Sequence, residues 1–207
     1  MESILVFGCG GHSKVVSDVI QREGNYRIAA YYDENPKNKM FLGTPVYSTK
    51  ADLQTAMISG NIKSAAIAIG SNEVRRKFSL MAQDLGLKLP VIVDPSAIIS
   101  QNVRLGRGTV VMPGAIVNTD TQILEGTILN TASVVEHDCV IGAYTHIAPG
   151  SVLCGGVHVG EMSLIGARTV AIPLTKIGAY CSIGAGSVVV REIPNNSCAY
   201  GNPARAK

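Results

Sequence analysis

A histidine flanked by two acidic residues stands in the middle of this 207-residue sequence, within an otherwise small and apolar stretch. The three residues are Glu136, His137 and Asp138. A neutral imidazole takes a proton from an attacking amine or hydroxyl near pH 7, and a neighbouring carboxylate fixes its tautomer and stabilises the imidazolium. We therefore predict that His137 is a general base and Asp138 its orienting partner. Glu136 should point away from His137, because side chains alternate along a strand.

A second chemical feature is the glycine-rich turn in "VFGCGGHSKVV", where a strand runs into a helix that begins near Ser13. Glycines let the backbone approach a phosphate, and the helix N-terminus offers free N–H groups to it. NAD is disfavoured, because Ser13 stands where the dinucleotide fingerprint has its third glycine. A tight turn without a ligand, and a loop or capping role for the histidine, stay open as alternatives. The residues expected to face a phosphate-bearing ligand are Gly8, Gly10, Gly11, His12 and Lys14.

Two further segments should border the same pocket. Asp33 and Glu34 end the second strand, where an acid can accept hydrogen bonds from a ribose or a base. Gly70 and Asn72 lie in "GSNEVRRK" at a helix start, which capping alone would also explain. We place all four residues at the carboxyl ends of parallel strands.

Residues 4–95 alternate short apolar runs with helix-like stretches. Strands alternating with helices predict a parallel βαβ sheet covered by helices on its faces. The expected strands are 4–7, 26–32, 65–69 and 90–93, and the expected helices are 13–22 and 73–85. This half should be a small doubly wound, Rossmann-like α/β domain.

The second half follows a six-residue period. Stepping by six from Leu105 to Val189 visits fifteen positions, of which fourteen are branched aliphatic residues and one is alanine. Four residues after each aliphatic the side chain is mostly small or β-branched, and a glycine often follows the aliphatic directly. This pattern predicts a β-solenoid of about five coils over residues 98–194, with inward aliphatics and a corner at the glycine. An irregular tail should follow Pro194 and run through residues 201–204.

Composition excludes several classes of protein. The net charge of +3 comes from scattered Lys and Arg without a basic block, which disfavours a nucleic-acid partner. No apolar run approaches the roughly 18 residues of a membrane span. The five cysteines are odd in number and form no CxxC pair, as expected for reduced thiols. We expect a cytoplasmic protein.

Motifs along the whole chain resemble one enzyme family. In order, "ILVFGCGGHSKVV", "YYDEN", "AIAIGSNEVRRK", "NTASVVEHDCVIG" and "GNPAR" are similar to hexapeptide-repeat acetyltransferases. The similar group contains sialic acid O-acetyltransferases and UDP-4-amino-sugar (bacillosamine-pathway) N-acetyltransferases. The resemblance implies a Rossmann-like nucleotide-sugar-binding domain over residues 1–97. It also implies a left-handed parallel β-helix over residues 98–207, which binds acetyl-CoA and carries the catalytic residues.

The resemblance also implies an activity. We expect an acetyl-CoA-dependent N-acetyltransferase without a metal, serving surface glycan or polysaccharide biosynthesis. The expected acceptor is a UDP-4-amino-4,6-dideoxy-N-acetyl-hexosamine, with GDP-perosamine-type N-acetylation or sialic acid O-acetylation as alternatives. A homotrimer should place the active sites between subunits.

Further site residues follow from that resemblance. With three strands per coil, residues eighteen apart are stacked, so Gly155 lies one coil from His137 and its N–H could stabilise an oxyanion, with Gly156 as the alternative. The resemblance adds Asn130 to the sugar-nucleotide contacts. The expected acetyl-CoA contacts are His146, Gly155, Gly156, Ala167, Asn202 and Pro203.

The sequence fits three other functions less well. A γ-carbonic-anhydrase-like metalloenzyme needs converging histidines, but the coil spacing puts no two of His137, His146 and His158 in register. A sugar-nucleotide pyrophosphorylase would need a larger N-terminal domain with its own Gly-rich loop. A non-catalytic scaffold would not bind coenzyme A.

Overall fold

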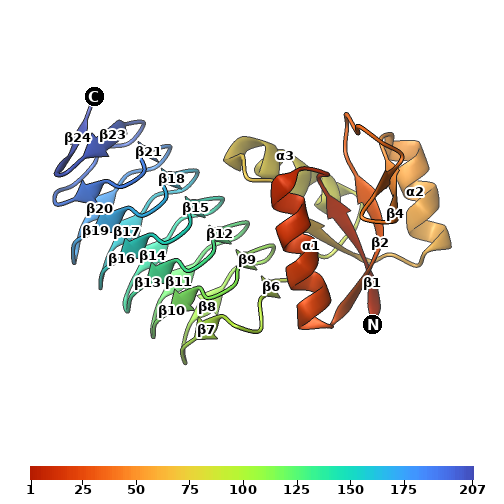
Figure 1. Cartoon of the computed structure of the whole chain (residues 1–207), viewed down its shortest axis with the longest axis horizontal. Coiled ribbons are helices and arrows are strands. Elements are labelled where there is room, and N and C mark those ends of the chain that lie inside the picture. Colours follow the sequence, from red (N-terminus) through yellow and green to blue (C-terminus); the bar gives the residue numbers. More distant parts are fainter. The chain divides into compact units, whose positions relative to one another are not determined.

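The computed structural model describes all 207 residues, which form two compact units, Met1–Pro95 and Ser96–Lys207 (Figure 1). The boundary lies two residues before the expected one at residue 97.

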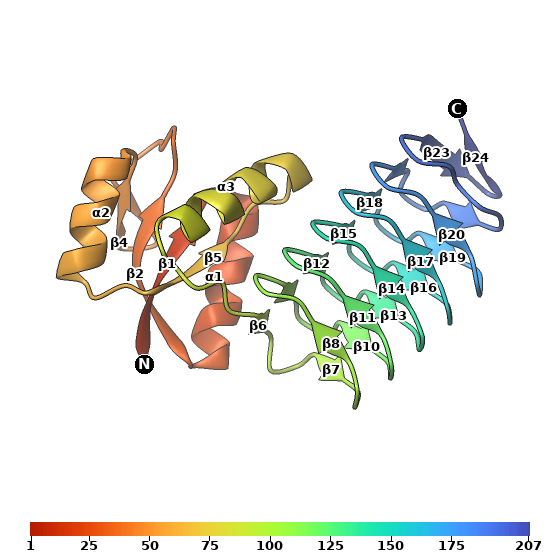
Figure 2. The ribbon, with the colours of Figure 1, turned by 180° about the vertical axis from the view of Figure 1, so that it is seen from behind.

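The first unit is a mainly parallel sheet in the order β3-β4-β2-β1-β5 (Figure 2). Its strands are β1 (Glu2–Phe7), β2 (Tyr26–Tyr32), β3 (Met40–Phe41), β4 (Thr44–Tyr47) and β5 (Ser64–Ile67). Its helices are α1 (Gly11–Glu23), α2 (Lys50–Ser59) and α3 (Asn72–Asp84), and β6 (Ile92–Val93) ends the unit. β1, β2, β5, α1 and α3 were predicted from the sequence, whereas the segment with β3, β4 and α2 was not. The strand expected at 90–93 forms as β6, but it is not part of this sheet, contrary to the prediction. Because β1 pairs with β2 on one side and β5 on the other, the crevice at its carboxyl end is the topological switch point.

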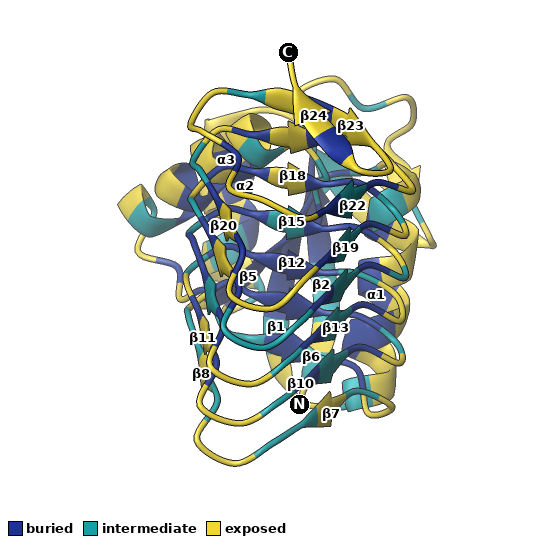
Figure 3. Ribbon diagram, turned by 90° about the vertical axis from the view of Figure 1, so that its left-hand side faces the viewer, coloured by how far each residue is buried: buried dark blue, intermediate teal, exposed yellow.

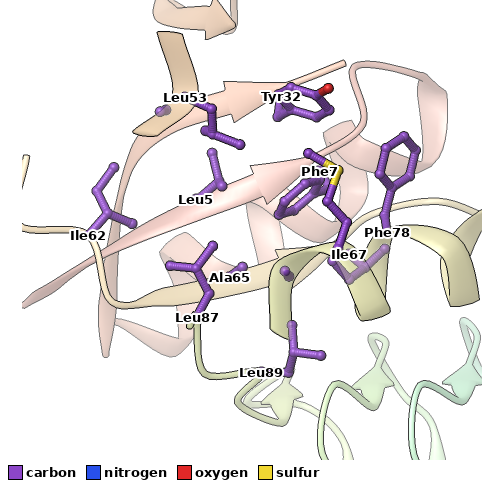
Figure 4. Packing of buried hydrophobic residues seen from close by; sticks show 13 residues of the cluster. Leu5, Phe7, Tyr32, Leu53, Ile62, Ala65, Ile67, Phe78, Leu87 and Leu89 are labelled. Carbon is purple, nitrogen blue, oxygen red and sulfur yellow. The ribbon is translucent and has the colours of Figure 1, made fainter. Parts of the chain in front are cut away.

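Aromatic packing holds α3 against this sheet. The ring centroids of Phe7 and Tyr32 lie 5.4 Å apart, and that of Phe78 on α3 lies 5.6 Å from Phe7 (Figure 4). Leu5, Leu53 and other buried side chains complete the cluster. The middle of α3 is thereby fixed close to the ends of β1 and β2.

The second unit is a parallel β-helix with three faces per coil (Figure 3). The first face holds β7 (Ile98–Ile99), β10 (Ile116–Val117), β13 (Val134–Val135), β16 (Val152–Leu153), β19 (Val170–Ala171) and β22 (Val188–Val189). The second face holds β8 (Arg104–Leu105), β11 (Gln122–Ile123), β14 (Val140–Ile141), β17 (His158–Val159) and β20 (Lys176–Ile177). The third face includes β9 (Val110–Val111), β12 (Ile128–Leu129), β15 (His146–Ile147), β18 (Leu164–Ile165) and β21 (Ser182–Ile183).

The register confirms the expected periodicity. Val134 pairs with Val152, eighteen residues later, so three six-residue repeats make one coil. Val135, Ile141 and Ile147 are completely buried, as the six-residue pattern predicts.

Serine and threonine also fill inward positions, because their hydroxyls cap the corners of the next coil. Thr145 donates to the carbonyl of Gly160 at 3.0 Å, and Ser151 donates to that of Gly166 at 2.8 Å. Both side chains are completely buried. The hydroxyls of Thr145 and Ser151 are therefore satisfied by the backbone that they pack against, whereas the buried Oγ of Ser133 has no hydrogen-bond partner.

The corner lies later in the repeat than the glycine pattern suggested. The left-handed turn residue stands three positions after the inward aliphatic, as at Gly108 (φ 67°) and Asp138 (φ 61°). The position directly after the aliphatic residue requires glycine for a different reason. A Cβ on Gly142 would lie 2.6 Å from the carbonyl carbon of Gly160 in the next coil. This position needs glycine for close stacking of coils, not for turning.

The expectation of an irregular tail is wrong. β23 (Cys198–Gly201) pairs in parallel with β21, and β24 (Ala204–Ala206) folds back on it as an antiparallel hairpin. Paired residues in neighbouring coils are closer in sequence here than in the rest of the solenoid, because Ser182 pairs with Cys198, sixteen residues later. The third face thus continues beyond the end of the six-residue period.

Candidate active site

His137 lies at the corner between β13 and β14, beside its expected partner. Its Nδ1 is 2.8 Å from Oδ2 of Asp138, and the two side chains are 58% and 67% exposed. The hydrogen bond to Asp138 raises the pKa of His137 above its usual value; desolvation opposes this, and the charges of Asp138 and Glu136 add to the rise. A neutral ring that donates from Nδ1 keeps Nε2 free to accept a proton.

Glycine in the next coil makes room for this ring. A Cβ on Gly155 would lie 2.6 Å from both Cε1 and Nε2 of His137, so the imidazole rests against the Gly155 backbone. The Gly156 N–H donates to the carbonyl of His137 at 2.9 Å, so Gly156 is not the free donor that the sequence analysis allowed as the alternative. Gly155 uses its carbonyl in stacking, accepting from Leu174 N at 2.9 Å, and its N–H is outside the coil-to-coil bonds.

Glu136 is turned along the first face, toward the preceding coil. Its Oε2 accepts a hydrogen bond from Asn118 Nδ2 at 2.8 Å. Asn118 is in turn contacted by Ser100, whose hydroxyl donates to its Oδ1 at 3.3 Å. Glu136 therefore influences His137 through its charge and makes no hydrogen bond to it.

The structure brings Asn130 and His146 together, although the sequence analysis assigned them to different ligands. Asn130 Nδ2 lies 2.9 Å from His146 Nε2. His146 begins β15 on the third face, while His137 occupies the corner between the other two faces and His158 begins β17 on the second. The three histidines thus lie apart on the prism, and no group of three His, Cys, Asp or Glu side chains is arranged to hold a metal ion.

The remaining predicted coenzyme contacts lie toward the C-terminus. Ala167 is half-buried, and its carbonyl accepts from Gly186 N at 2.8 Å. Asn202 and Pro203 form the exposed turn between β23 and β24. Within one chain none of them contacts the His137 corner.

The predicted phosphate turn joins β1 to α1. Gly10 precedes the helix without a side-chain cap, and the first turn holds no acidic residue, so its N–H groups are available to an anion. Gly8 has φ 104°, and a Cβ there would lie 2.9 Å from Ile69 Cγ1, so this turn requires glycine. Ser13 is buried and donates to the Gly8 carbonyl at 2.7 Å, which closes the turn.

Two adjoining cavities open around this turn, of about 440 Å³ and about 380 Å³. The larger is bordered by Lys14, Lys37 and Phe41, and the smaller by His12, Glu34 and Gly70. Both share Cys9, Gly10, Gly11, Asp33 and Asn35. All predicted substrate residues of the first unit except Asn72 line this cleft.

The two acids at the end of β2 already have partners. Asp33 accepts from the N–H of Cys9 and that of Asn35, each at 3.0 Å, so its carboxylate fastens two walls of the cleft. Glu34 forms an ion pair with Lys77 at 2.7 Å. Burial, and then Asp33, raise the pKa of the Cys9 thiol to about 11, so it stays protonated.

Arg75, which is not among the residues predicted from the sequence, is 1% exposed inside α3. Its guanidinium donates to the carbonyls of Ile69 (3.2 Å) and Gly70 (3.0 Å) and to Oδ1 of Asn72 (2.7 Å). Burial, and then the charge of Arg75, lower the pKa of His12 to about 4. His12 is therefore neutral near pH 7 in the absence of a ligand; it lines the smaller cavity, and its contact with a phosphate stays a prediction. The signal for Arg75 was its position one helical turn before Phe78, on the buried face of α3.

Comparison with known proteins agrees with this architecture. The family model of the PglD N-terminal domain matches residues 3–81. UDP-N-acetylbacillosamine N-acetyltransferase of Bacillus subtilis (strain 168) is 37% identical over 113 residues, which span 52% of this chain and 50% of that protein. The match thus covers about half the length of the curated relative.

Solved structures match the whole chain. The acetyltransferase domain of PglB from Neisseria gonorrhoeae has a TM-score of 0.90 and 34% identity, covering 100% of both chains. A variant of perosamine N-acetyltransferase from Caulobacter crescentus, solved with CoA and GDP-perosamine, has a TM-score of 0.94 and 39% identity, covering 100% of this chain and 97% of that one.

These likenesses confirm the expected fold, a Rossmann-like domain followed by a left-handed β-helix. No helix has the length and apolar character needed to cross a membrane. The chain belongs to the hexapeptide-repeat acetyltransferases with a PglD-type N-terminal domain, the family of the nucleotide-amino-sugar N-acetyltransferases.

Proposed function

We propose that this chain transfers the acetyl group of acetyl-CoA to the amine of a nucleotide-linked amino sugar. The observation that carries the proposal is the His137–Asp138 pair at 2.8 Å, with Nε2 lying over the backbone of Gly155. Relatives that act on UDP-linked and GDP-linked amino sugars support the same class of reaction.

In the proposed mechanism His137 Nε2 takes the proton of the amine as its nitrogen attacks the thioester carbonyl. The Gly155 N–H stabilises the oxyanion of the tetrahedral intermediate. Collapse of that intermediate breaks the carbon–sulfur bond, and the departing coenzyme A thiolate takes the proton back from His137. Asp138 keeps Nδ1 protonated throughout and stabilises the transient imidazolium.

The coenzyme and the acceptor nucleotide would bind to different parts of the chain. We assign the coenzyme to the solenoid surface with His146, Ala167 and the Asn202–Pro203 turn. The acceptor nucleotide belongs in the cleft around Gly10, where the uncapped start of α1 favours a diphosphate. Binding energy from the nucleotide would then position the distant amine.

The acceptor proposed is a UDP-linked 4-amino-4,6-dideoxy sugar, with a GDP-linked amino sugar as the alternative and O-acetylation of sialic acid as the second. A cytoplasmic enzyme of surface glycan or polysaccharide biosynthesis fits this chemistry. All five cysteines are free thiols, as in a reducing compartment.

A homotrimer is part of the proposal, because a base that is more than half exposed needs another surface to exclude water. The outward positions of the first face form an unbroken aliphatic column: Ile98, Ile116, Val134, Val152, Val170 and Val188. We assign this column to the subunit interface. Light scattering after size exclusion should give three times the chain mass for the wild type, and Val152→Glu should reduce it. A wild-type monomer with full activity would contradict the assembly.

The function is tested by following thiol release from acetyl-CoA. The acceptors are UDP-, GDP- and dTDP-linked amino sugars, CMP-sialic acid and free sialic acid, with His137→Ala as the inactive control. We expect turnover on at least one nucleotide amino sugar, and most on a UDP-linked one. Turnover of free sialic acid, with none on any nucleotide amino sugar, would overturn the proposed acceptor class.

A further inference from the structure

The two cavities beside the turn at Gly10 differ in charge. The larger, of about 440 Å³, is lined by Lys14, Lys37 and one carboxylate, that of Asp33. The smaller, of about 380 Å³, is lined by Asp33 and Glu34 and by no lysine or arginine. A ligand with negative charge at one end is therefore attracted to the larger cavity and repelled from the smaller one.

Both lysines of the larger cavity are available to a ligand. Lys14 and Lys37 are exposed, and neither forms an ion pair. The carboxylate between them is already engaged, because Asp33 accepts the N–H groups of Cys9 and Asn35, each at 3.0 Å. The two ammonium groups therefore face this cavity without a carboxylate bound to them.

The smaller cavity offers no cation in its lining. Oε1 and Oε2 of Glu34 lie 2.8 Å and 2.7 Å from Nζ of Lys77, which does not border the cavity. Burial, and then Arg75, lower the pKa of His12 to about 4, so this ring is neutral near pH 7 in the absence of a ligand. Arg75 itself is 1% exposed and lines neither cavity, so a ligand does not reach its guanidinium.

Apolar lining does not distinguish the two cavities. Phe41 borders the larger one and Phe78 the smaller one. A nucleobase gains by packing against either ring. The position of the charges therefore decides which end of a nucleotide each cavity binds.

The loop that carries Lys37 is fastened on both sides of it. Before Lys37, the N–H of Asn35 donates to Oδ1 of Asp33 at 3.0 Å. After it, the carbonyl of Lys39 accepts from the N–H of Val46 at 2.9 Å. Lys37 is thus presented to the cavity by a loop whose ends are held by the sheet.

We infer that the larger cavity binds the diphosphate of the acceptor through Lys14 and Lys37, and that the smaller cavity binds its nucleoside. The inference rests on the proposed function for the identity of the ligand. It adds Lys37 to the residues that contact the substrate. It also gives the nucleotide one direction along the cleft, with the diphosphate beside β3 and the base beside α3.

The two cavities can be probed separately with ligands that share a nucleoside. UDP and GDP are compared with uridine and guanosine, each titrated into the purified full chain and followed by ligand-observed NMR, which also measures weak binding. Lys37→Met removes one charge from the larger cavity. Lys39→Met is the matched control, because Lys39 is exposed in the same loop and lines neither cavity. Val74→Lys places a cation in the wall of the smaller cavity.

We expect Lys37→Met to lower the affinity for UDP and GDP about tenfold, the scale of one charge-assisted contact, and to change nucleoside affinity less than about twofold. Lys39→Met should change neither affinity. Val74→Lys should weaken nucleoside and diphosphate by the same factor, because its long side chain takes up space where the base binds. In the thiol-release assay Lys37→Met should raise KM for the nucleotide sugar and leave KM for acetyl-CoA unchanged.

An equal loss of nucleoside and diphosphate affinity in Lys37→Met, or a matching loss in Lys39→Met, would overturn the inference. Tighter diphosphate binding in Val74→Lys would overturn it too, because the phosphates would then lie in the smaller cavity. A loss of acetyl-CoA affinity in Lys37→Met would assign the larger cavity to the coenzyme instead. These outcomes leave acetyl transfer standing, which thiol release reports separately. A wild-type chain that binds neither UDP nor GDP would overturn the inference together with the nucleotide cleft.

Discussion

Gly155→Ala tests whether the position of the His137 ring controls turnover. The new methyl carbon would lie 2.6 Å from Cε1 and Nε2, about 0.8 Å inside the ordinary contact distance of 3.4 Å. Gly155 has no positive φ, so alanine brings no backbone strain of its own. The exposed ring must therefore retreat from the coil, and its 2.8 Å bond to Asp138 and its place over the Gly155 N–H must change with it.

A misplacement of about 1 Å in a reacting group costs roughly 100-fold in rate. We expect kcat to fall about 10- to 100-fold, since the ring moves by slightly less than that. The melting temperature should stay within about 3 °C, because the crowded side chain is free to move into solvent.

The assay is steady-state thiol release at saturating acetyl-CoA and acceptor, repeated in a His137→Ala background. In that background the methyl meets no ring, so adding Gly155→Ala should cause no further loss. Full turnover in the single variant would refute the reasoning, and so would an equal additional loss in the double variant.

Three further outcomes follow from the same geometry. His137→Ala should lower kcat about 100-fold or more, while equilibrium binding of both substrates persists; near-native turnover would remove its role as base. Asp138→Asn should move the acid limb of the pH–rate profile to lower pH, because the carboxylate raises the pKa of His137 and the base must be neutral to work; an unmoved limb would contradict this. Asp33→Ala should raise KM for the nucleotide sugar and leave KM for acetyl-CoA unchanged, because it frees the N–H groups of Cys9 and Asn35 that hold the cleft walls; an equal change in both KM values would argue for general unfolding.

The solenoid was predictable because its information is local and repeated. A six-residue period specifies which side chains point inward, and Val135 and Ile141 lie where it puts them. The hairpin at residues 198–206 was not predictable in the same way, since it begins where the period ends. The reason for the glycines that follow the aliphatic residues could not be predicted either, because Gly142 is constrained by the backbone of Gly160, one coil away.

The same difference between local and distant contacts decides which residues of the candidate site could be predicted. Asp138 could be paired with His137 because the two are adjacent in sequence. The partner of Glu34 is Lys77, forty-three residues away, and sequence alone offers no distance between them. Arg75 was overlooked for a different reason, because a charged residue on a helix is normally expected to face solvent. Only its spacing of three residues from Phe78 indicated that it lies on the buried face of α3.

Stacking at intervals of eighteen residues also constrains how the length of this chain can change through evolution. The corner around His137 draws on the coils of Thr119 and Gly155 alone, its immediate neighbours. An insertion or deletion of one whole coil elsewhere in the prism leaves that corner intact. A change of six residues instead carries every later side chain to the next face, and separates the base from Gly155 if it falls between them. Viable relatives should therefore differ in solenoid length by whole coils.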